Sequence, residues 1–400
     1  MKKVLTVFDT SRLTGRDLLR GAEAFFSTFA QWEVYTLDPN YLSGDFAKEL
    51  QQLDLETFDG FIGHTRTREF ICCTENISSI LKDQKPEKNL YTPKEKIAGI
   101  SPIVTNSSQI GKTAADYFIS RGFKNYAYCG FINIAWSDRR YKSYREALSQ
   151  KGFNDIRYFM HRPSRDKLTD QKNMATWLEK LPKPIAIFAC NDDRAVYILE
   201  ACKSSHIHVP EDVAVLGVDN DDLVCNLSSP PLSSIALNFK NAGFQAAQHL
   251  DQLMMKNAEN TTLDVVPVEI FTRKSTDIVA IEDPELSSAI VFIRDHYQEP
   301  IQVTDVVSAT TILRRELEYR FKFEFKKTVQ EEINRLRIEL IKKMLMTSRE
   351  PVYQIANQLE FTDPEHFSRY FKNLTGISPS VFRRSSVNAS IMLHEPFVKL

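Results

Sequence analysis

Residues 185–202 read IAIFACNDDRAVYILEAC. The stretch begins with an unbroken run of six small and apolar residues, which is typical of a strand that is buried on both faces of a parallel sheet. Three polar residues, Asn191 to Asp193, follow at once, and the pattern predicts a helix from there to about residue 203. A buried strand that leads directly into a helix is the repeating unit of a doubly wound α/β fold.

The same alternation runs through the first 275 residues. Strands are predicted at 4–8, 32–37, 58–64, 96–100, 125–130, 156–161, 185–190 and 213–219, with helices near 15–29, 45–53, 108–121, 138–151, 170–180 and 192–203. Alternation of this length predicts doubly wound parallel sheets, which bind small molecules in the crevice beyond the carboxyl ends of their strands.

After about residue 277 every periodic segment is helical. Helices are predicted near 285–297, 304–309, 313–323, 330–346, 352–359 and 364–374. We therefore expect an α/β domain in residues 1–277, followed by an all-α domain in residues 278–400.

The composition is that of a globular protein, with 42% hydrophobic residues in a chain of 400. The first apolar run is too short for the core of a signal peptide, and no stretch approaches the roughly 18 apolar residues of a membrane span. The six cysteines form no CxxC pair, which favours free buried thiols in a reducing cytoplasm. The net charge of −1 hides a basic segment, because residues 305–384 carry fifteen Lys and Arg against eleven Asp and Glu.

The all-α domain contains one arrangement twice, a short helix, a tight turn and a second helix. Apolar spacing predicts the buried residues of each second helix, which are Leu313, Leu317 and Phe321 in the first copy and Phe367, Tyr370, Phe371 and Leu374 in the second. A helix-turn-helix unit places its second helix in the major groove of DNA. We call the second helix of each copy, near 313–323 and 364–374, its reading helix. The helix between the copies, about 25 Å long, could set two such helices in successive grooves about 34 Å apart.

Residues 352–384, VYQIANQLEFTDPEHFSRYFKNLTGISPSVFRR, resemble the second helix-turn-helix signature of the arabinose-regulator (AraC-type) family of transcription factors. The chain departs from the family at Glu360, where glycine is usual in the turn, and in the first copy at Val307 and Thr311. Two caps compete for the start of the second reading helix, a box of Thr362 with Glu365 and the pair Asp363–Pro364. The candidate DNA-binding residues are Arg314, Arg315, Glu318, Arg320, Glu365, His366, Arg369 and Lys372.

Residues 209–222, VPEDVAVLGVDNDD, and 228–254, SSPPLSSIALNFKNAGFQAAQHLDQLM, resemble the closing segment of the lactose-repressor and periplasmic sugar-binding fold. The resemblance implies two Rossmann-like lobes that close over a ligand by a hinge motion, 1–122 with 238–262 and 123–237 with 263–277.

The same resemblance implies that Asp219, Asn191 and Arg140 grip sugar hydroxyls. Additional candidates are Arg16, Trp136 and His64. Each of these three has a structural alternative: an ion pair within its helix for Arg16, a place in the core for Trp136, and a hydrogen bond to its own loop for His64. Asp192 is expected to cap the helix that follows it.

The order of the parts, sensor first and paired helix-turn-helix last, resembles the xylose-operon regulators. It implies a cytoplasmic, sugar-responsive homodimer that binds an operator in double-stranded DNA, with D-xylose as the expected effector and RNA polymerase as a further partner if the protein is an activator. The alternatives are a sensor of another sugar, a sugar phosphate or a purine, a sugar-binding transport receptor, and an enzyme on a Rossmann-like scaffold. No nucleophile, metal or cofactor motif is apparent in the sequence, so no cofactor is expected.

Overall fold

The computed structural model describes residues 1–37, 52–64, 70–75, 77, 99–132, 134–161, 167–278, 283–348, 350–361 and 363–388. The chain divides into two compact units, Met1–Phe118 with Lys124–Ile278, which we call the sensor unit, and Ile119–Phe123 with Val279–Leu400, which we call the helical unit. The predicted helix at 45–53 lies almost wholly outside the described residues. None of the described helices is long and apolar enough to cross a membrane.

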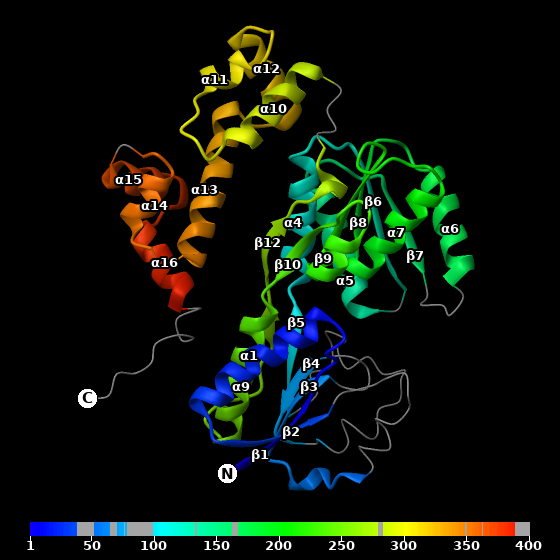
Figure 1. Ribbon diagram of the computed structural model, residues 1–400, viewed down its shortest axis with the longest axis vertical. Coiled ribbons are helices and arrows are strands. Elements are labelled where there is room, and N and C mark those ends of the chain that lie inside the picture. The colour runs from blue at the N-terminus through cyan, green and yellow to red at the C-terminus, as the bar shows by residue number, and fades with distance from the viewer. Residues whose placement is uncertain are drawn as a thin grey trace. The chain divides into compact units, whose positions relative to one another are not determined.

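The sensor unit contains two six-stranded sheets (Figure 1). The first has the order β11-β5-β4-β3-β1-β2, formed by Leu263–Val265, Ile100–Thr105, Phe70–Cys73, Gly60–His64, Lys2–Val7 and Trp32–Leu37. Helices α1 (Leu13–Phe29) and α9 (Phe239–Met254) pack against each other beside it. Their backbones approach so closely that a Cβ on Gly21 would lie 1.8 Å from the carbonyl oxygen of Lys240.

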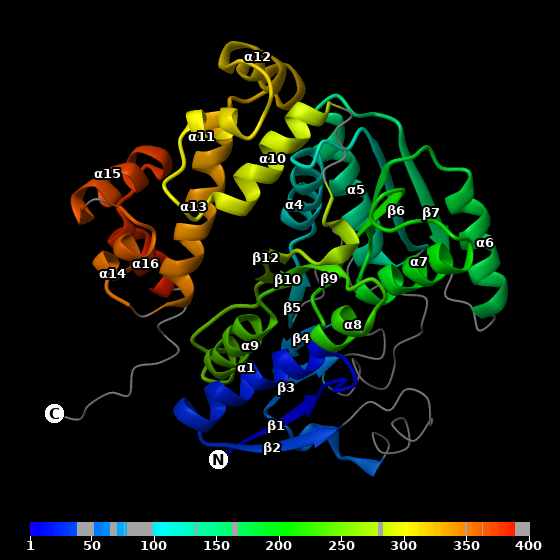
Figure 2. The ribbon, with the colours of Figure 1, turned by 45° about the horizontal axis from the view of Figure 1, so that its top comes forward.

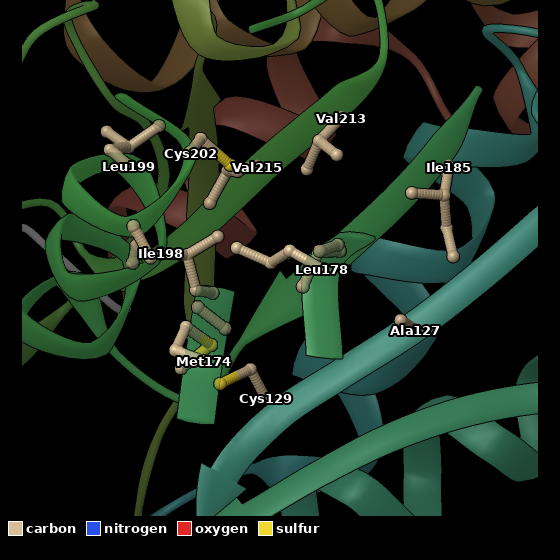
Figure 3. Packing of buried hydrophobic residues seen from close by; sticks show 14 of the residues in the cluster. Ala127, Cys129, Met174, Leu178, Ile185, Ile198, Leu199, Cys202, Val213 and Val215 are labelled. Carbon is tan, nitrogen blue, oxygen red and sulfur yellow. The ribbon is translucent and has the colours of Figure 1, made fainter. Parts of the chain in front are cut away.

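The second sheet has the order β12-β10-β9-β8-β6-β7. Its strands are Pro267–Phe271, Ser233–Leu237, Val213–Asp219, Ile185–Ala189, Asn125–Phe131 and Ile156–His161, with helices α4 (Ser107–Ile119), α5 (Ala135–Ser149), α6 (Lys167–Glu179), α7 (Asp192–Ser204) and α8 (Asp222–Leu227). Figure 3 shows the core between this sheet and helices α6 and α7, where Met174 and Leu178 meet Ile198 and Val215.

The sheets are not wholly parallel, which corrects the expectation. β4 runs antiparallel to both β3 and β5, and β12 runs antiparallel to β10. For β3 and β4 the reason is the connection, which spans only residues 65–69, whereas a parallel pair needs a crossover of a dozen or more residues. The strand expected at 96–100 is β5, which begins only at Ile100.

Three crossovers join the two lobes, after β5, after β10 and between β11 and β12. At these points the Asn106 amide donates to the Val265 carbonyl over 2.8 Å, and the Asn238 amide donates to the Val266 carbonyl over 3.0 Å. The predicted lobe limits are therefore wrong in two places. Helix α4 belongs to the second lobe, where Ser143 of α5 donates to a carbonyl of α4, and β11 belongs to the first.

The helical unit consists of α10 to α16: Pro284–His296, Val303–Ser308, Arg314–Phe325, Val329–Thr347, Val352–Gln358, Pro364–Thr375 and Pro379–Asn388. It contains two separate apolar cores, one around Leu317 and Phe321 and the other around Phe367 and Phe371. Both cores include residues of α13, which lies between α10–α12 and α14–α16 (Figure 2). Helix α16 was not predicted.

Most of the predicted burial in the two reading helices is confirmed. Two residues are corrected: Leu313 is 80% exposed and Leu374 is 45% exposed. Leu313 is the residue before the first turn of α12, so it lies outside the periodic stripe, and Leu374 lies in the last turn of α15. All six cysteines are free and buried, as predicted.

Candidate functional site

Three predicted ligand-binding residues meet at the carboxyl edge of the second sheet. The guanidinium of Arg140, which is 3% exposed, donates to the carbonyl of Cys190, the residue after β8. Its Nη2 lies 3.6 Å from Oδ1 of Asp219, the last residue of β9. The Arg140 guanidinium also lies 5.1 Å from the centre of the Trp136 ring. The carboxyl edge of this sheet therefore combines a carboxylate, a guanidinium and an aromatic ring.

Two polar atoms of this cluster are buried without a hydrogen-bond partner among the described residues. They are Nε of Arg140 and Oδ1 of Asp219. A buried polar atom that is left unpaired costs free energy, so both atoms have unused capacity for a polar ligand. Burial raises the pKa of Asp219 to about 6, against the opposing effect of the Arg140 charge. A ligand hydroxyl that donates a hydrogen bond to the Asp219 carboxylate would therefore stabilise its ionised form.

Asn191 is the N-cap of α7, and its Oδ1 accepts a hydrogen bond from the Arg194 amide over 3.0 Å. The prediction that Asp192 caps this helix is wrong by one residue. Asp192 is instead 3% exposed, and its carboxylate accepts hydrogen bonds from Ser234 and from the Asp221 amide. Because the cap uses only Oδ1, the amide nitrogen of Asn191 can still donate to a ligand.

His64 and Arg16 come from the first lobe. Nδ1 of His64 accepts a hydrogen bond from the Asp9 amide over 3.1 Å, which is the loop contact given as its alternative. Arg16 does not pair within its own helix. Its Nη1 donates to the Thr10 carbonyl over 2.9 Å, and its Nη2 lies 3.7 Å from Asp221 of the second lobe. Arg16 therefore lies between the lobes.

One serine–histidine pair has the composition of a catalytic dyad. Oγ of Ser101 lies 2.9 Å from Nε2 of His249. However, Ser101 is wholly buried, and its hydroxyl also donates to Asn260 and accepts from the Thr261 amide. The pair thus ties β5 and α9 to the segment before β11, and the hydroxyl does not face solvent.

The second reading helix, α15, has the expected outward face. Asp363 caps it by accepting from the His366 amide, and Pro364 occupies its first turn; Thr362, the rival cap, lies outside the described residues. Phe367 and Phe371 are buried, whereas the four candidate DNA-binding residues, Glu365, His366, Arg369 and Lys372, are exposed. Asp–Pro in this position supplies both a side-chain acceptor and a preset φ at the helix start.

The first reading helix, α12, holds three of its four predicted DNA-binding residues in ion pairs. Arg315 is exposed, and Arg314 pairs with Glu318 over 3.0 Å, whereas Arg320 bonds Glu316 and, over 3.0 Å, Asp283 at the start of α10. Arg320 is therefore held by two carboxylates of the helical unit, and its contact with DNA stays a prediction.

The centre of the exposed face of α12 is aromatic, which the sequence reading missed. Tyr319 is 72% exposed and Phe323 is 66% exposed. The signal was present in the spacing, because residues 315, 319 and 322 follow the helical repeat opposite the buried Leu317 and Phe321. A hollow of about 550 Å³ beside this face is lined by Arg314, Arg315, Glu318, Tyr319, Lys322 and the start of α13.

Comparison with known proteins agrees with this architecture. Residues 115–276 match the periplasmic binding protein-like domain family, and residues 306–385 match a helix-turn-helix domain family. A periplasmic-binding-protein-like sensor followed by a paired helix-turn-helix of the AraC type defines a transcription regulator, and the expected fold class is confirmed.

Individual relatives of known role extend over nearly the whole chain. The xylose operon regulatory protein of Escherichia coli (strain K12) is 25% identical over 399 residues, which are 98% of this chain and 98% of that protein. The xylose operon regulatory protein of Haemophilus influenzae is 24% identical over 387 residues, 95% of this chain and 98% of that one. A solved structure of a xylose-binding transcription activator has the same fold, with a TM-score of 0.53, 23% identity, and coverage of 96% and 98% of the two chains.

Proposed function

We propose that the chain is a D-xylose-responsive activator of transcription that acts in the cytoplasm as a homodimer and recruits RNA polymerase. The observation that carries the proposal is the Arg140–Asp219 pair at the crevice, with its two buried and unpaired polar atoms. The xylose operon regulators that match the chain over nearly its full length support the choice of sugar.

The chemistry of the crevice suits a pyranose. Sugar hydroxyls both donate and accept hydrogen bonds, so a carboxylate, a guanidinium and an amide can bind three of them at fixed angles. Asp219, Arg140 and the amide nitrogen of Asn191 would supply these groups. The Trp136 ring would cover the apolar face of the sugar, since aromatic rings pack well against C–H surfaces.

The helical unit would read the operator with α12 and α15. Its exposed basic residues, Arg315, Lys322, Arg369 and Lys372, can contact phosphates or guanine edges. A ligand that binds the closed lobes more tightly than the open ones would shift the regulator toward the closed state. The shift can be no larger than the difference between the two affinities.

The test is a thermal-shift panel of pentoses, hexoses, sugar phosphates and purines on the full chain. A bound ligand raises the apparent melting temperature by mass action, and we expect D-xylose to give the largest shift. Asp219→Asn should abolish the shift, whereas Asp222→Asn, an exposed neighbour, should retain it. A larger response to a hexose, a sugar phosphate or a purine would replace D-xylose as the effector, and an unchanged response of Asp219→Asn would refute the assigned site.

A further inference from the structure

A carboxylate of the second lobe caps a helix of the first. Oδ2 of Asp221 accepts a hydrogen bond from the Leu13 amide at the start of α1, over 3.1 Å, and lies 3.7 Å from the Arg16 guanidinium. The residue in the N-cap position of α1, Arg12, provides no side-chain cap of its own. The first amides of a helix need acceptors, and a carboxylate is favoured there by the helix dipole. The cap of helix α1 therefore comes from the other lobe.

A second ion pair crosses at the same place. Arg12 Nη1 lies 2.8 Å from Asp193 Oδ1, but these side chains are 54% and 38% exposed, and exposed pairs contribute little. Asp221, in contrast, is 8% exposed, and its Oδ1 is buried without a hydrogen-bond partner among the described residues. Of the two contacts between the lobes, the one made by Asp221 is therefore shielded from water. Its formation requires the lobes to be close together.

Asp221 shares a rigid turn with Asp219, the carboxylate assigned to the ligand. Asp219 and Asn220 both have positive φ, at 104° and 53°, a conformation that the surrounding contacts must hold. The amides of Asn220 and Asp221 donate to Ser234 and Asp192, over 3.1 and 2.9 Å, and Arg273 donates to the Asn220 side chain over 2.9 Å. The turn therefore moves with the second lobe as one piece.

We propose that Asp221 is the latch of the sensor: it caps α1 only when the lobes are closed, and thereby sets how strongly an effector in the crevice is bound without contacting that effector. The inference rests on the proposed function in so far as the effector occupies the crevice. The apparent affinity of a ligand falls with the fraction of protein in the binding-competent state, so loss of the latch weakens binding while leaving the ligand contacts intact.

The test measures lobe closure and helix capping separately. Fluorescent labels on Glu23→Cys and Lys203→Cys, both exposed and one in each lobe, report closure of the full chain as D-xylose is added. In Asp221→Ala we expect half-closure at about tenfold more D-xylose, with full closure still reached at saturation. Asp222→Asn is the matched control and should close at the wild-type concentration. Closure of Asp221→Ala at the wild-type concentration would overturn the proposal.

Hydrogen exchange of the first-turn amides of α1 tests the cap itself. With saturating D-xylose, which closes the lobes of both proteins, these amides should exchange faster in Asp221→Ala than in the wild type, and equal rates would overturn the latch. If D-xylose does not close the wild type, the proposed effector fails, and the same comparison is made with the ligand of the thermal-shift panel that gives the largest shift. Asp221→Leu, which has a similar size and removes the hydrogen-bond acceptor, replaces the alanine variant should that one fail to fold.

Discussion

Burial disfavours the ionised form of the Asp219 carboxyl group. Its side chain is four-fifths buried, and burial raises its pKa to about 6, above the ordinary value of 3.8. Because the folded pKa is raised, the folded state binds the proton more tightly than the unfolded chain does. The ionised group therefore costs stability above pH 6, and this cost disappears as the pH falls through the folded and then the unfolded pKa.

The same shift predicts a pH-dependent affinity. The ionised carboxylate is the form that accepts hydrogen bonds from two hydroxyls, so D-xylose should bind about tenfold more weakly at pH 5 than at pH 7.5. Isothermal titration calorimetry across this range, on the wild type and on Asp219→Asn, measures it. A wild-type affinity that does not change with pH would show that Asp219 is not the group that binds the sugar.

Tyr319 is the most exposed ring on the first reading helix, at 72%. An apolar ring in the major groove gains most from the methyl group of thymine, which cytosine and uracil lack. With an operator selected from random DNA, replacing one thymine of the first half-site by uracil should weaken binding by about 1 kcal/mol, the value of one buried methyl group. In Tyr319→Ala the same replacement should have no effect. The matched change in the second half-site, where Arg369 holds the corresponding position, should also be neutral.

At the scale of elements, the turn between α14 and α15 carries strain. Glu360 has a φ of 56°, a left-handed conformation that costs a residue with a side chain about 1 kcal/mol relative to glycine. Its side chain is exposed, and no packing offsets this cost. The departure of this position from glycine, noted in the sequence, thus has the expected structural consequence.

Glu360→Gly should therefore stabilise α14 and α15 by about 1 kcal/mol. All three tryptophans, at positions 32, 136 and 177, lie in the sensor unit, so fluorescence would not report on this turn. Hydrogen exchange of the α14 and α15 amides does. Glu360→Ala is the control, because it removes the same charge but keeps the side chain in the left-handed region. Equal exchange in the two variants would assign the effect to charge.

Periodicity predicted many of the elements but missed others, among them the 16-residue helix α9. β2, β7 and β9 have the predicted bounds. Strand β4 has only four residues from which a period can be recognised, whereas α16, with ten, is longer than the predicted helix α11. The cap of α7 differed by one residue because Asn191 and Asp192 are both good caps. The Asp221–Leu13 contact joins residues 208 apart, and such a pairing leaves no local signal in the sequence.

In the helical unit as a whole, one arginine bridges the two halves. Arg337 of α13 is 6% exposed, and it donates to the Glu299 carbonyl beyond α10 and, over 3.0 Å, to the Leu359 carbonyl at the end of α14. Its guanidinium also lies 5.0 Å from the centre of the Phe361 ring. Because the two cores share only α13 among the described residues, we expect this bridge to set the angle between the reading helices.

Arg337→Met should therefore preserve each half but loosen the angle between them. Affinity for DNA with both half-sites should fall about tenfold, while affinity for a single half-site stays within about twofold, since simultaneous engagement depends on geometry. Gel-shift titration of the two DNAs measures this difference. Lys342→Met, which removes a charge from the same helix, is the control. Equal losses on both DNAs would mean that Arg337 supports folding or charge and does not set the spacing.

At the scale of the whole protein, the sensor and the DNA-reading helices must be linked reciprocally if the sugar regulates binding to DNA. If D-xylose changes the affinity for the operator by some factor, the operator changes the affinity for D-xylose by the same factor, whichever direction the effect takes. We expect a factor of about 10, which corresponds to about 1.4 kcal/mol of coupling. Calorimetric titration of D-xylose with and without operator, and of operator with and without D-xylose, gives both numbers. Asp221→Ala should need more D-xylose for half-saturation both with and without operator. The factor by which D-xylose changes operator affinity should still equal the factor by which operator changes D-xylose affinity. Binding of each ligand unaffected by the other would mean that closure of the lobes is not transmitted to the helices that read DNA.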